Sequence, residues 1–305
     1  MKKLKTFVFL SLLLTGCKNS LPSSSEKDSI ATEEKISNKV QVVLMYGQSN
    51  MEGHTHKEYL VSTMGKEKTK EYIDGYEDVK ISYACTITQN TSNKEFVPVK
   101  LGQGYMTDRF GPEVGMAEYF HNQNLETPVY LIKFAQGATS LYNSWRSPTS
   151  GMTGSLYRFA MDYTIEQLQK LESMDLYPEV KAICWMQGED DSSSNFYENY
   201  YNYETALIED MREELNYYAS PDGIGFVDAG ISDCSAWTHH IEINDAKKQL
   251  AEDDQNHIYF GTIDEKLEYN KEPMGNPDIY HYDSSSMIKL GKVFAEKVTE
   301  NFLEK

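Results

Sequence analysis

The sequence is poor in the residues with which proteins bind nucleic acid. It has 29 lysines and arginines against 47 aspartates and glutamates, which gives a formal net charge of −18. Arginine is scarce, and its few copies lie far apart, at positions 109, 146, 158 and 212. A DNA or RNA backbone has to be met by a basic surface. The sequence therefore excludes nucleic acid as an expected partner, and no segment of it predicts a protein partner.

Cysteine is also scarce, with 4 copies in 305 residues: Cys17, Cys85, Cys184 and Cys234. This number is too small for a disulfide scaffold, and the cysteines lack the short paired spacing of a zinc site. Because Cys17 lies in the N-terminal segment described below, at most one disulfide is expected among the other three, and the pair stays open. The remaining composition, 40% hydrophobic and 25% charged, is typical of a globular chain with a sizeable core.

The N-terminal apolar run is short. It extends over residues 6–14, after lysines at positions 2, 3 and 5, whereas a membrane-spanning helix needs roughly 20 apolar residues. This pattern predicts a secretory signal peptide. The run ends in Leu14-Thr15-Gly16-Cys17, which resembles the lipobox of bacterial lipoproteins. That resemblance implies a signal peptide over residues 1–16, a lipidated Cys17, and a membrane-anchored protein outside the cytoplasm, at the cell surface or in the periplasm. Which membrane carries the anchor stays open.

Residues 17–39 follow as a polar segment rich in Ser, Glu, Lys and Asn. Such a composition predicts a flexible linker, because it offers too little apolar surface for a core. Residues 40–305 show no further linker, repeat or shift of composition. They are expected to form one domain.

Within that domain, continuous apolar runs alternate with amphipathic stretches. The runs cover residues 40–47, 128–135, 180–188, 223–230 and 258–264, and the amphipathic stretches lie near residues 112–122, 156–171, 196–215, 241–252 and 285–303. Continuous hydrophobicity indicates strands buried on both faces. The alternation predicts an α/β fold, a three-layer α/β/α sandwich with a central five-stranded parallel sheet. Residues 55–108 break the pattern, with a further candidate strand at residues 83–87.

A candidate nucleophile follows the first predicted strand, in Gly47-Gln48-Ser49-Asn50-Met51. In parallel α/β sheets the ligand crevice lies outside the carboxyl ends of the strands. Ser49 lies at such an end, where its hydroxyl can project from the sheet. The segment is not the G-x-S-x-G elbow of α/β-hydrolases, because Met51 replaces the second glycine. A helix cap is the alternative role for Ser49.

A candidate base lies near the other end of the chain, in Asp278-Ile279-Tyr280-His281. A serine nucleophile needs a base to take its proton, and the imidazole needs a carboxylate that fixes its tautomer. An aspartate three residues before a histidine can reach the Nδ1 side of the ring. A surface ion pair is the alternative interpretation.

Two more predicted strand ends carry polar motifs. The second strand leads into residues 136–141, QGATSL, with Trp145 beyond them, and the third leads into residues 185–189, WMQGE. Together with GQSNM and D-x-x-H, these blocks resemble the SGNH hydrolase superfamily, and more closely its sialate O-acetylesterase and carbohydrate esterase family six branch. The resemblance spans residues 40–295 and implies a flavodoxin-like SGNH hydrolase fold.

The resemblance also implies site residues. Ser49 would be the nucleophile, His281 the general base, and Asp278 the residue that orients His281. The backbone N–H groups of Ser49 and Gly137 and the side chain of Gln187 would form the oxyanion hole. No metal and no cofactor is implied.

Some assignments stay open. Glu189 competes with Asp278 for the orienting role, because some relatives have HQGE where this chain has Met186 before QGE. Glu189 is otherwise a buried acid that ties loops together. The candidate substrate-binding residues are Gln48, Asn50, Trp145 and Arg146.

The predicted function is that of a serine esterase (a carboxylic ester hydrolase) which removes O-acetyl groups from carbohydrate through an acetyl-serine intermediate. An acetylated xylan-type polysaccharide or oligosaccharide is the first substrate expected. Alternatives are acetylated sialic acid, a lipid or aryl ester, and a non-catalytic glycan-binding lipoprotein that retains the fold. The sugar, the hydroxyl and the oligomeric state stay open.

Overall fold

The computed structural model describes residues 38–85 and 87–304. The predicted signal peptide, Cys17 and the linker up to residue 37 lie outside the described residues. The first strand begins at Lys39, the last residue of the predicted linker. The Lys39 ammonium pairs with Glu179 at 2.9 Å and with Glu304, and the Glu304 N–H donates to the Gln41 side chain at 2.8 Å. The beginning of β1 and the last described residue, Glu304, are therefore joined.

The strands and helices follow one another along the chain as the pattern of apolar runs predicts, with additions. The strands are β1 Lys39–Gly47, β2 Thr55–His56, β3 Tyr76–Cys85, β4 Asn90–Thr91, β5 Val97–Val99, β6 Arg109–Phe110, β7 Val129–Ala135, β8 Tyr177–Met186, β9 Gly225–Ala229 and β10 His257–Phe260. The α-helices are α2 Ser49–Glu52, α3 Leu60–Met64, α4 Lys66–Asp74, α5 Glu113–Gln123, α6 Ser155–Ser173, α7 Glu189–Ser192, α8 Tyr200–Glu214, α9 His240–Asp253 and α10 Ser284–Asn301. Short helical turns are η1 Lys57–Tyr59, η2 Leu141–Trp145, η3 Pro148–Ser150, η4 Tyr197–Asn199 and η5 Asn216–Tyr218.

The main sheet is larger than predicted. In the described part of the chain it has eight strands, in the order β10-β9-β8-β1-β7-β3-β4, and β5 also pairs with β3. The pairs from β10 to β3 are all parallel, whereas β4 and β5 are antiparallel to β3. The prediction of five strands was therefore wrong, because β3 is a sixth parallel strand. Its first residues include the exposed Glu77 and Asp78, which interrupt the apolar pattern.

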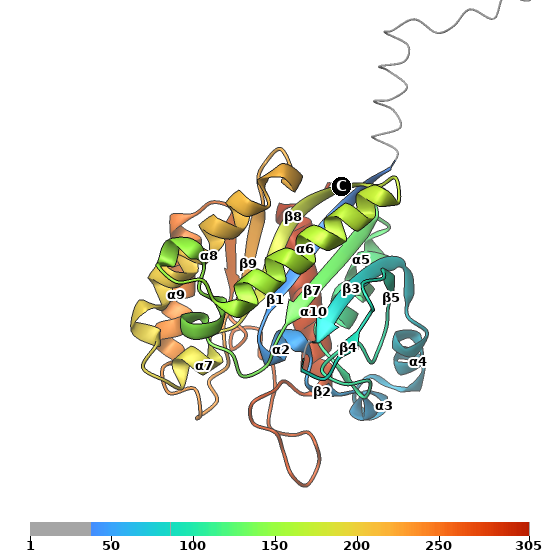
Figure 1. Cartoon of the computed structure of the whole chain (residues 1–305). Coiled ribbons are helices and arrows are strands. Elements are labelled where there is room, and N and C mark those ends of the chain that lie inside the picture. Colours follow the sequence, from blue (N-terminus) through green and yellow to red (C-terminus); the bar gives the residue numbers. More distant parts are fainter. Residues whose placement is uncertain (1–37, 86, 305) are drawn as a thin grey trace, which may run out of the picture. The chain divides into compact units, whose positions relative to one another are not determined.

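Helices cover both faces of this sheet. In Figure 1, α6 crosses in front of the central strands, and α5 and α10 lie behind them. Burial on both faces accounts for the unbroken apolar sequence of β1, in which every residue after Lys39 is buried. The fold is a mixed α/β fold with a mostly parallel central sheet, as predicted.

Two glycines allow α5 and α10 to pack closely. A Cβ atom on Gly115 would lie 2.0 Å from the Ile288 carbonyl oxygen, and one on Gly291 would lie 2.0 Å from the Pro112 carbonyl oxygen. Any side chain at either position would force the helices apart. Since α10 begins shortly after Asp278 and His281, this contact also fixes the position of that segment.

Two further findings concern the state of the cysteines and membrane-spanning helices. Cys85, Cys184 and Cys234 are buried free thiols. Among the described helices, none combines the length and the hydrophobicity that crossing a membrane requires.

Candidate active site

The candidate active site lies at the C-terminal end of β1. Gly47 has φ +147°, and a Cβ atom there would lie 2.0 Å from the Met186 carbonyl oxygen, so only glycine lets β1 end this close to β8. The chain turns at Gln48, and Ser49 is the first residue of α2. Ser49 thus lies at the carboxyl edge of the sheet, between the ends of β7 and β8.

His281 and Asp278 lie in the segment that leads into α10. Nδ1 of His281 and Oδ2 of Asp278 are 2.6 Å apart, and a second oxygen of Asp278 accepts a hydrogen bond from the Tyr280 N–H at 2.8 Å. Partial burial opposes ionisation of Asp278, but the hydrogen bond and charge of His281 outweigh it, so the pKa of this carboxyl lies below its usual value. An ionised Asp278 is suited to hold the imidazole in one tautomer.

Ser49 and His281 line the same cavity, which has a volume of about 350 Å³. Residues from several loops complete its wall: Gln48, Glu52, His54, Ile87, Tyr105, Gly137, Ala138, Asp190, Trp237 and Tyr280. Two of them, Glu52 and Asp190, are carboxylates, and no lysine or arginine is found among the described residues of the wall. Partial burial raises the pKa of Asp190. The cavity is therefore acidic and partly aromatic.

Three rings form a stack along one wall. His54 lies between Tyr105, at a centroid distance of 4.3 Å, and His281, at 4.6 Å. Nε2 of His54 lies 2.9 Å from Oε2 of the buried Glu52. The site thus contains a second carboxylate–imidazole pair beside Asp278 and His281.

Glu189 does not hydrogen-bond to His281 in the described structure. Its Oε1 accepts a hydrogen bond from the Asn50 side chain at 2.9 Å, and the Asn50 Oδ1 accepts one from the Tyr282 N–H at 3.3 Å. Burial raises the pKa of Glu189, although the hydrogen bond from Asn50 opposes the shift. Glu189, at the start of α7, is therefore a buried acid bonded to α2, and Asn50 in turn connects α2 to the segment before α10.

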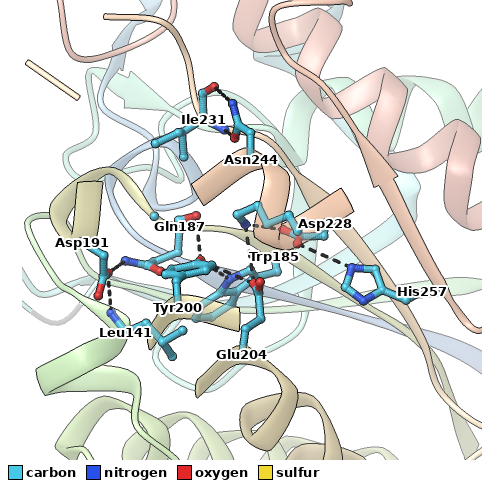
Figure 2. Close-up of polar contacts among 12 residues, drawn as sticks. Leu141, Trp185, Gln187, Asp191, Tyr200, Glu204, Asp228, Ile231, Asn244 and His257 are labelled. Carbon is cyan, nitrogen blue, oxygen red and sulfur yellow. Dashed lines mark hydrogen bonds and ion pairs between the residues drawn. The ribbon is translucent and has the colours of Figure 1, made fainter. Parts of the chain in front are cut away.

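Gln187 is not placed in the cavity, contrary to the predicted oxyanion role. Its side chain is fully buried, and its amide nitrogen donates to Asp191 Oδ2 at 2.7 Å and to the Thr139 carbonyl at 3.0 Å. Figure 2 shows the amide between Asp191 and Tyr200, whose hydroxyl lies 3.0 Å from Gln187 Oε1. Both amide hydrogens are thus engaged, and Gln187 holds the loop that follows β7 instead of a substrate.

Asp191 extends this support. Its carboxylate accepts hydrogen bonds from the N–H groups of Leu141 at 2.7 Å and Tyr142 at 3.0 Å. Burial raises the pKa of Asp191 to about 6, and the hydrogen bonds from Gln187, Tyr142 and Leu141 limit that rise. The buried Lys247 pairs with Asp228. Figure 2 shows Asp228 in a polar cluster with Glu204 and His257.

Three predicted substrate-binding residues do not line the cavity. Asn50 is buried against Glu189. Trp145 is fully buried and packs edge-on against Trp185, at a centroid distance of 5.2 Å. Arg146 lies over the Tyr203 ring, 3.9 Å from its centroid, and bonds to Ser150. Of the four predicted residues, Gln48 alone lies in the described wall.

Several wall residues carry no motif that assigns them to the site. Trp237 and Tyr280 form a tilted ring pair at 5.5 Å, and Tyr105 and Ile87 come from the irregular segment between β3 and β6. Trp237 lies in a loop after the fourth predicted strand, and a tryptophan in such a loop is only a weak signal of a binding site. Nothing in the sequence distinguished Tyr105 from the other tyrosines. The described residues contain no cluster of three or more His, Cys, Asp or Glu side chains suited to a metal ion.

Several solved structures have the same fold. NanS matches with a TM-score of 0.60 at 13% identity, over 86% of this chain and 97% of that one. A protein from Arabidopsis thaliana matches with a TM-score of 0.58 at 19% identity, over 86% and 99%. A carbohydrate acetylesterase from Xanthomonas citri matches with a TM-score of 0.54 at 15% identity, over 85% and 56%. At these identities the likeness shows the fold alone.

The sequence itself decides the family. The description of the family whose model matches residues 39–300 reads "Carbohydrate esterase, sialic acid-specific acetylesterase". The class of protein is therefore a carboxylic ester hydrolase. The chain belongs to the sialic acid-specific acetylesterase family of carbohydrate esterases. No curated protein matches the sequence significantly.

Proposed function

We propose that this protein is a serine esterase that removes O-acetyl groups from carbohydrate, with Ser49, His281 and Asp278 as its catalytic triad. One observation carries the proposal: His281, whose Nδ1 lies 2.6 Å from Asp278 Oδ2, lines the same cavity as Ser49. These are the parts of a nucleophile, a base and an orienting acid.

In this proposal the Ser49 hydroxyl attacks the acetyl carbonyl while His281 takes its proton. The tetrahedral intermediate collapses when His281 returns the proton to the departing sugar oxygen, which leaves acetyl-Ser49. Water, deprotonated by His281, then attacks the acetyl carbonyl. The bond to the Ser49 oxygen breaks as His281 returns the proton to that oxygen, and acetate is released. Asp278 stabilises the imidazolium that forms in both steps. Backbone N–H groups beside Ser49 stabilise the oxyanion, and each such donor typically contributes about 10²–10³ in rate.

The charge of the cavity favours a neutral sugar. Glu52 and Asp190 line it without any lysine or arginine in the described wall, so the carboxylate of a sialic acid would meet charges of its own sign. Acetylated hydroxyls of a xylan-type polysaccharide or oligosaccharide carry no charge. The rings of Trp237 and Tyr280 offer apolar faces for a sugar ring. Acetylated xylan-type carbohydrate is the proposed substrate.

Acetylated sialic acid is the second candidate. It is favoured by the description of the matching family. A panel of acetylated xylan, acetylated mannan and acetylated sialic acid separates the two candidates. Acetate release fastest from xylan or mannan supports the neutral substrate, and release fastest from sialic acid overturns it.

The esterase activity is tested on the protein without residues 1–17. Wild type should hydrolyse 4-nitrophenyl acetate, and Ser49→Ala should lose that activity while keeping its unfolding temperature. Ser147 is buried and does not line the cavity, so Ser147→Ala serves as the control for replacing a serine elsewhere in the protein. Equal activity of Ser49→Ala and wild type would remove Ser49 from the mechanism.

We also propose that Cys17 carries a lipid, which anchors the protein to a membrane so that the folded domain lies outside the cytoplasm. The proposal rests on the lipobox-like sequence Leu14-Thr15-Gly16-Cys17. Two or three acyl chains give stable anchoring, where one chain gives marginal binding. Expressed from the full-length gene, wild type should fractionate with membranes and Cys17→Ser should not. Equal membrane association of both proteins would contradict lipidation.

A further inference from the structure

The N–H group of Gly137, expected in the oxyanion hole, already has a strong acceptor. It donates to Oε2 of Glu52 at 2.8 Å. An N–H carries one hydrogen, so a charge-assisted bond to a carboxylate competes directly with a substrate carbonyl. In addition, a carboxylate in this position would repel an oxyanion bound to the same hydrogen.

The neighbouring residue offers a different donor. Ala138 lines the cavity, and its N–H makes no hydrogen bond with the described residues. Its φ is +55°, in the left-handed region, which is strained for a non-glycine residue and often marks functional sites. A strained conformation persists only where the surrounding contacts hold it.

Glu52 supplies one such contact and is itself held firmly. Its carboxylate accepts from His54 at 2.9 Å as well as from Gly137. Its carbonyl oxygen accepts from the buried Lys133 ammonium at 3.0 Å, and Lys133 also bonds Glu113 at 2.9 Å. The loop that contains Ala138 is therefore attached to a fixed side chain at Gly137.

The same loop is held at its other end. The Thr139 carbonyl accepts from Gln187, and the N–H groups of Leu141 and Tyr142 donate to Asp191. Ala138 thus lies between two anchored stretches of backbone. Its strained conformation follows from this double attachment.

We infer that Glu52 is a positioning residue for the esterase reaction, which holds Gly137 so that the Ala138 N–H, with that of Ser49, stabilises the oxyanion. The inference rests on the proposed function, because it assigns parts to the same reaction. Glu52 acts through the loop and does not touch the reacting atoms.

Kinetics of two Glu52 variants test the positioning role. Glu52→Ala releases Gly137 and should lower kcat roughly a hundredfold, the loss typical of one oxyanion donor, with little change in KM. Glu52→Gln keeps an oxygen acceptor for Gly137 and should recover most of kcat. Unchanged or higher kcat in Glu52→Ala would overturn the inference, and a higher value would show that Glu52 blocks a donor. Equal losses in both variants would also contradict it.

A crystal structure of wild type inactivated with an organophosphonate tests the donor directly. The phosphonyl oxygen on Ser49 should lie about 3 Å from the Ala138 nitrogen, with Gly137 still bonded to Glu52. If the phosphonyl oxygen instead accepts from the Gly137 N–H, and Glu52 has moved away, the inference is overturned while the proposed function stands. Failure of Ser49 to react, together with inactive wild type, would refute the proposed function and the inference with it.

Discussion

The imidazole ring of His54 stacks on that of His281, with centroids 4.6 Å apart and planes inclined by 18°. Because His54 is also bonded to Glu52, the base of the proposed triad rests on a ring that cannot turn freely. The orientation of His281 is thus fixed at its edge by Asp278 and on its face by His54.

Replacement of the stacked ring should slow the reaction. An aromatic contact contributes about 0.5–1.5 kcal/mol, so His54→Ala should lower kcat by up to roughly tenfold. His54→Phe keeps the stack without the hydrogen bond to Glu52 and should lose less. Steady-state kinetics with 4-nitrophenyl acetate measure both variants. A larger loss in His54→Phe than in His54→Ala would show that the ring face is unimportant.

The two candidate acids should differ strongly in their effects. Asp278→Asn removes the charge bonded to His281 and should lower kcat by about 10⁴-fold, as expected for an orienting aspartate. Glu189→Gln should have a much smaller effect, because Glu189 is bonded to Asn50 and burial raises its pKa. The ratio of the two kcat values decides the assignment. A greater loss in Glu189→Gln would transfer the orienting role to Glu189.

Burial of Asp191 predicts a specific dependence of stability on pH. Its pKa is raised from 3.8 to about 6, so the folded state binds more protons than the unfolded state between these values. Its contribution to the free energy of unfolding should therefore fall as pH rises through this window, by on the order of 3 kcal/mol. Urea unfolding of wild type and Asp191→Asn at pH 4.5 to 7.5 measures it. The difference in stability, wild type minus variant, should decrease with pH, and a constant difference would contradict the raised pKa.

The aromatic wall predicts a substrate-dependent effect. Trp237→Ala removes a ring that pairs with Tyr280 and should raise KM for an acetylated oligosaccharide roughly fivefold, the value of one aromatic contact. KM for 4-nitrophenyl acetate should change less, since that ester has no sugar ring. Trp237→Phe keeps an aromatic face as the matched control. Equal changes for both substrates would argue against a sugar at this wall.

The sequence predicted the layout of the fold because continuous apolar runs have one main explanation, strands buried on both faces. It located only the end of β3, as the candidate strand at residues 83–87, because the exposed Glu77 and Asp78 at the beginning of β3 interrupt that pattern. At the site, Asp278 and His281 could be paired because three residues separate them. Gln187 could not be placed, since the sequence does not tell toward which side of a strand end an amide turns. Trp145 was ambiguous for a related reason: its large apolar surface suits a core as well as a sugar site.

The contact of Lys39 with Glu179 and Glu304 determines where the preceding segment joins the folded unit. β1 extends over nine residues from that point to Gly47, beside Ser49. Its two ends are separated by eight steps, which at about 3.3 Å each gives about 26 Å. Lys39 therefore lies at the opposite edge of the sheet from the cavity. A support attached to the folded unit at Lys39 should leave the cavity open to a polymer in solution, whereas attachment near Tyr280 would obstruct it.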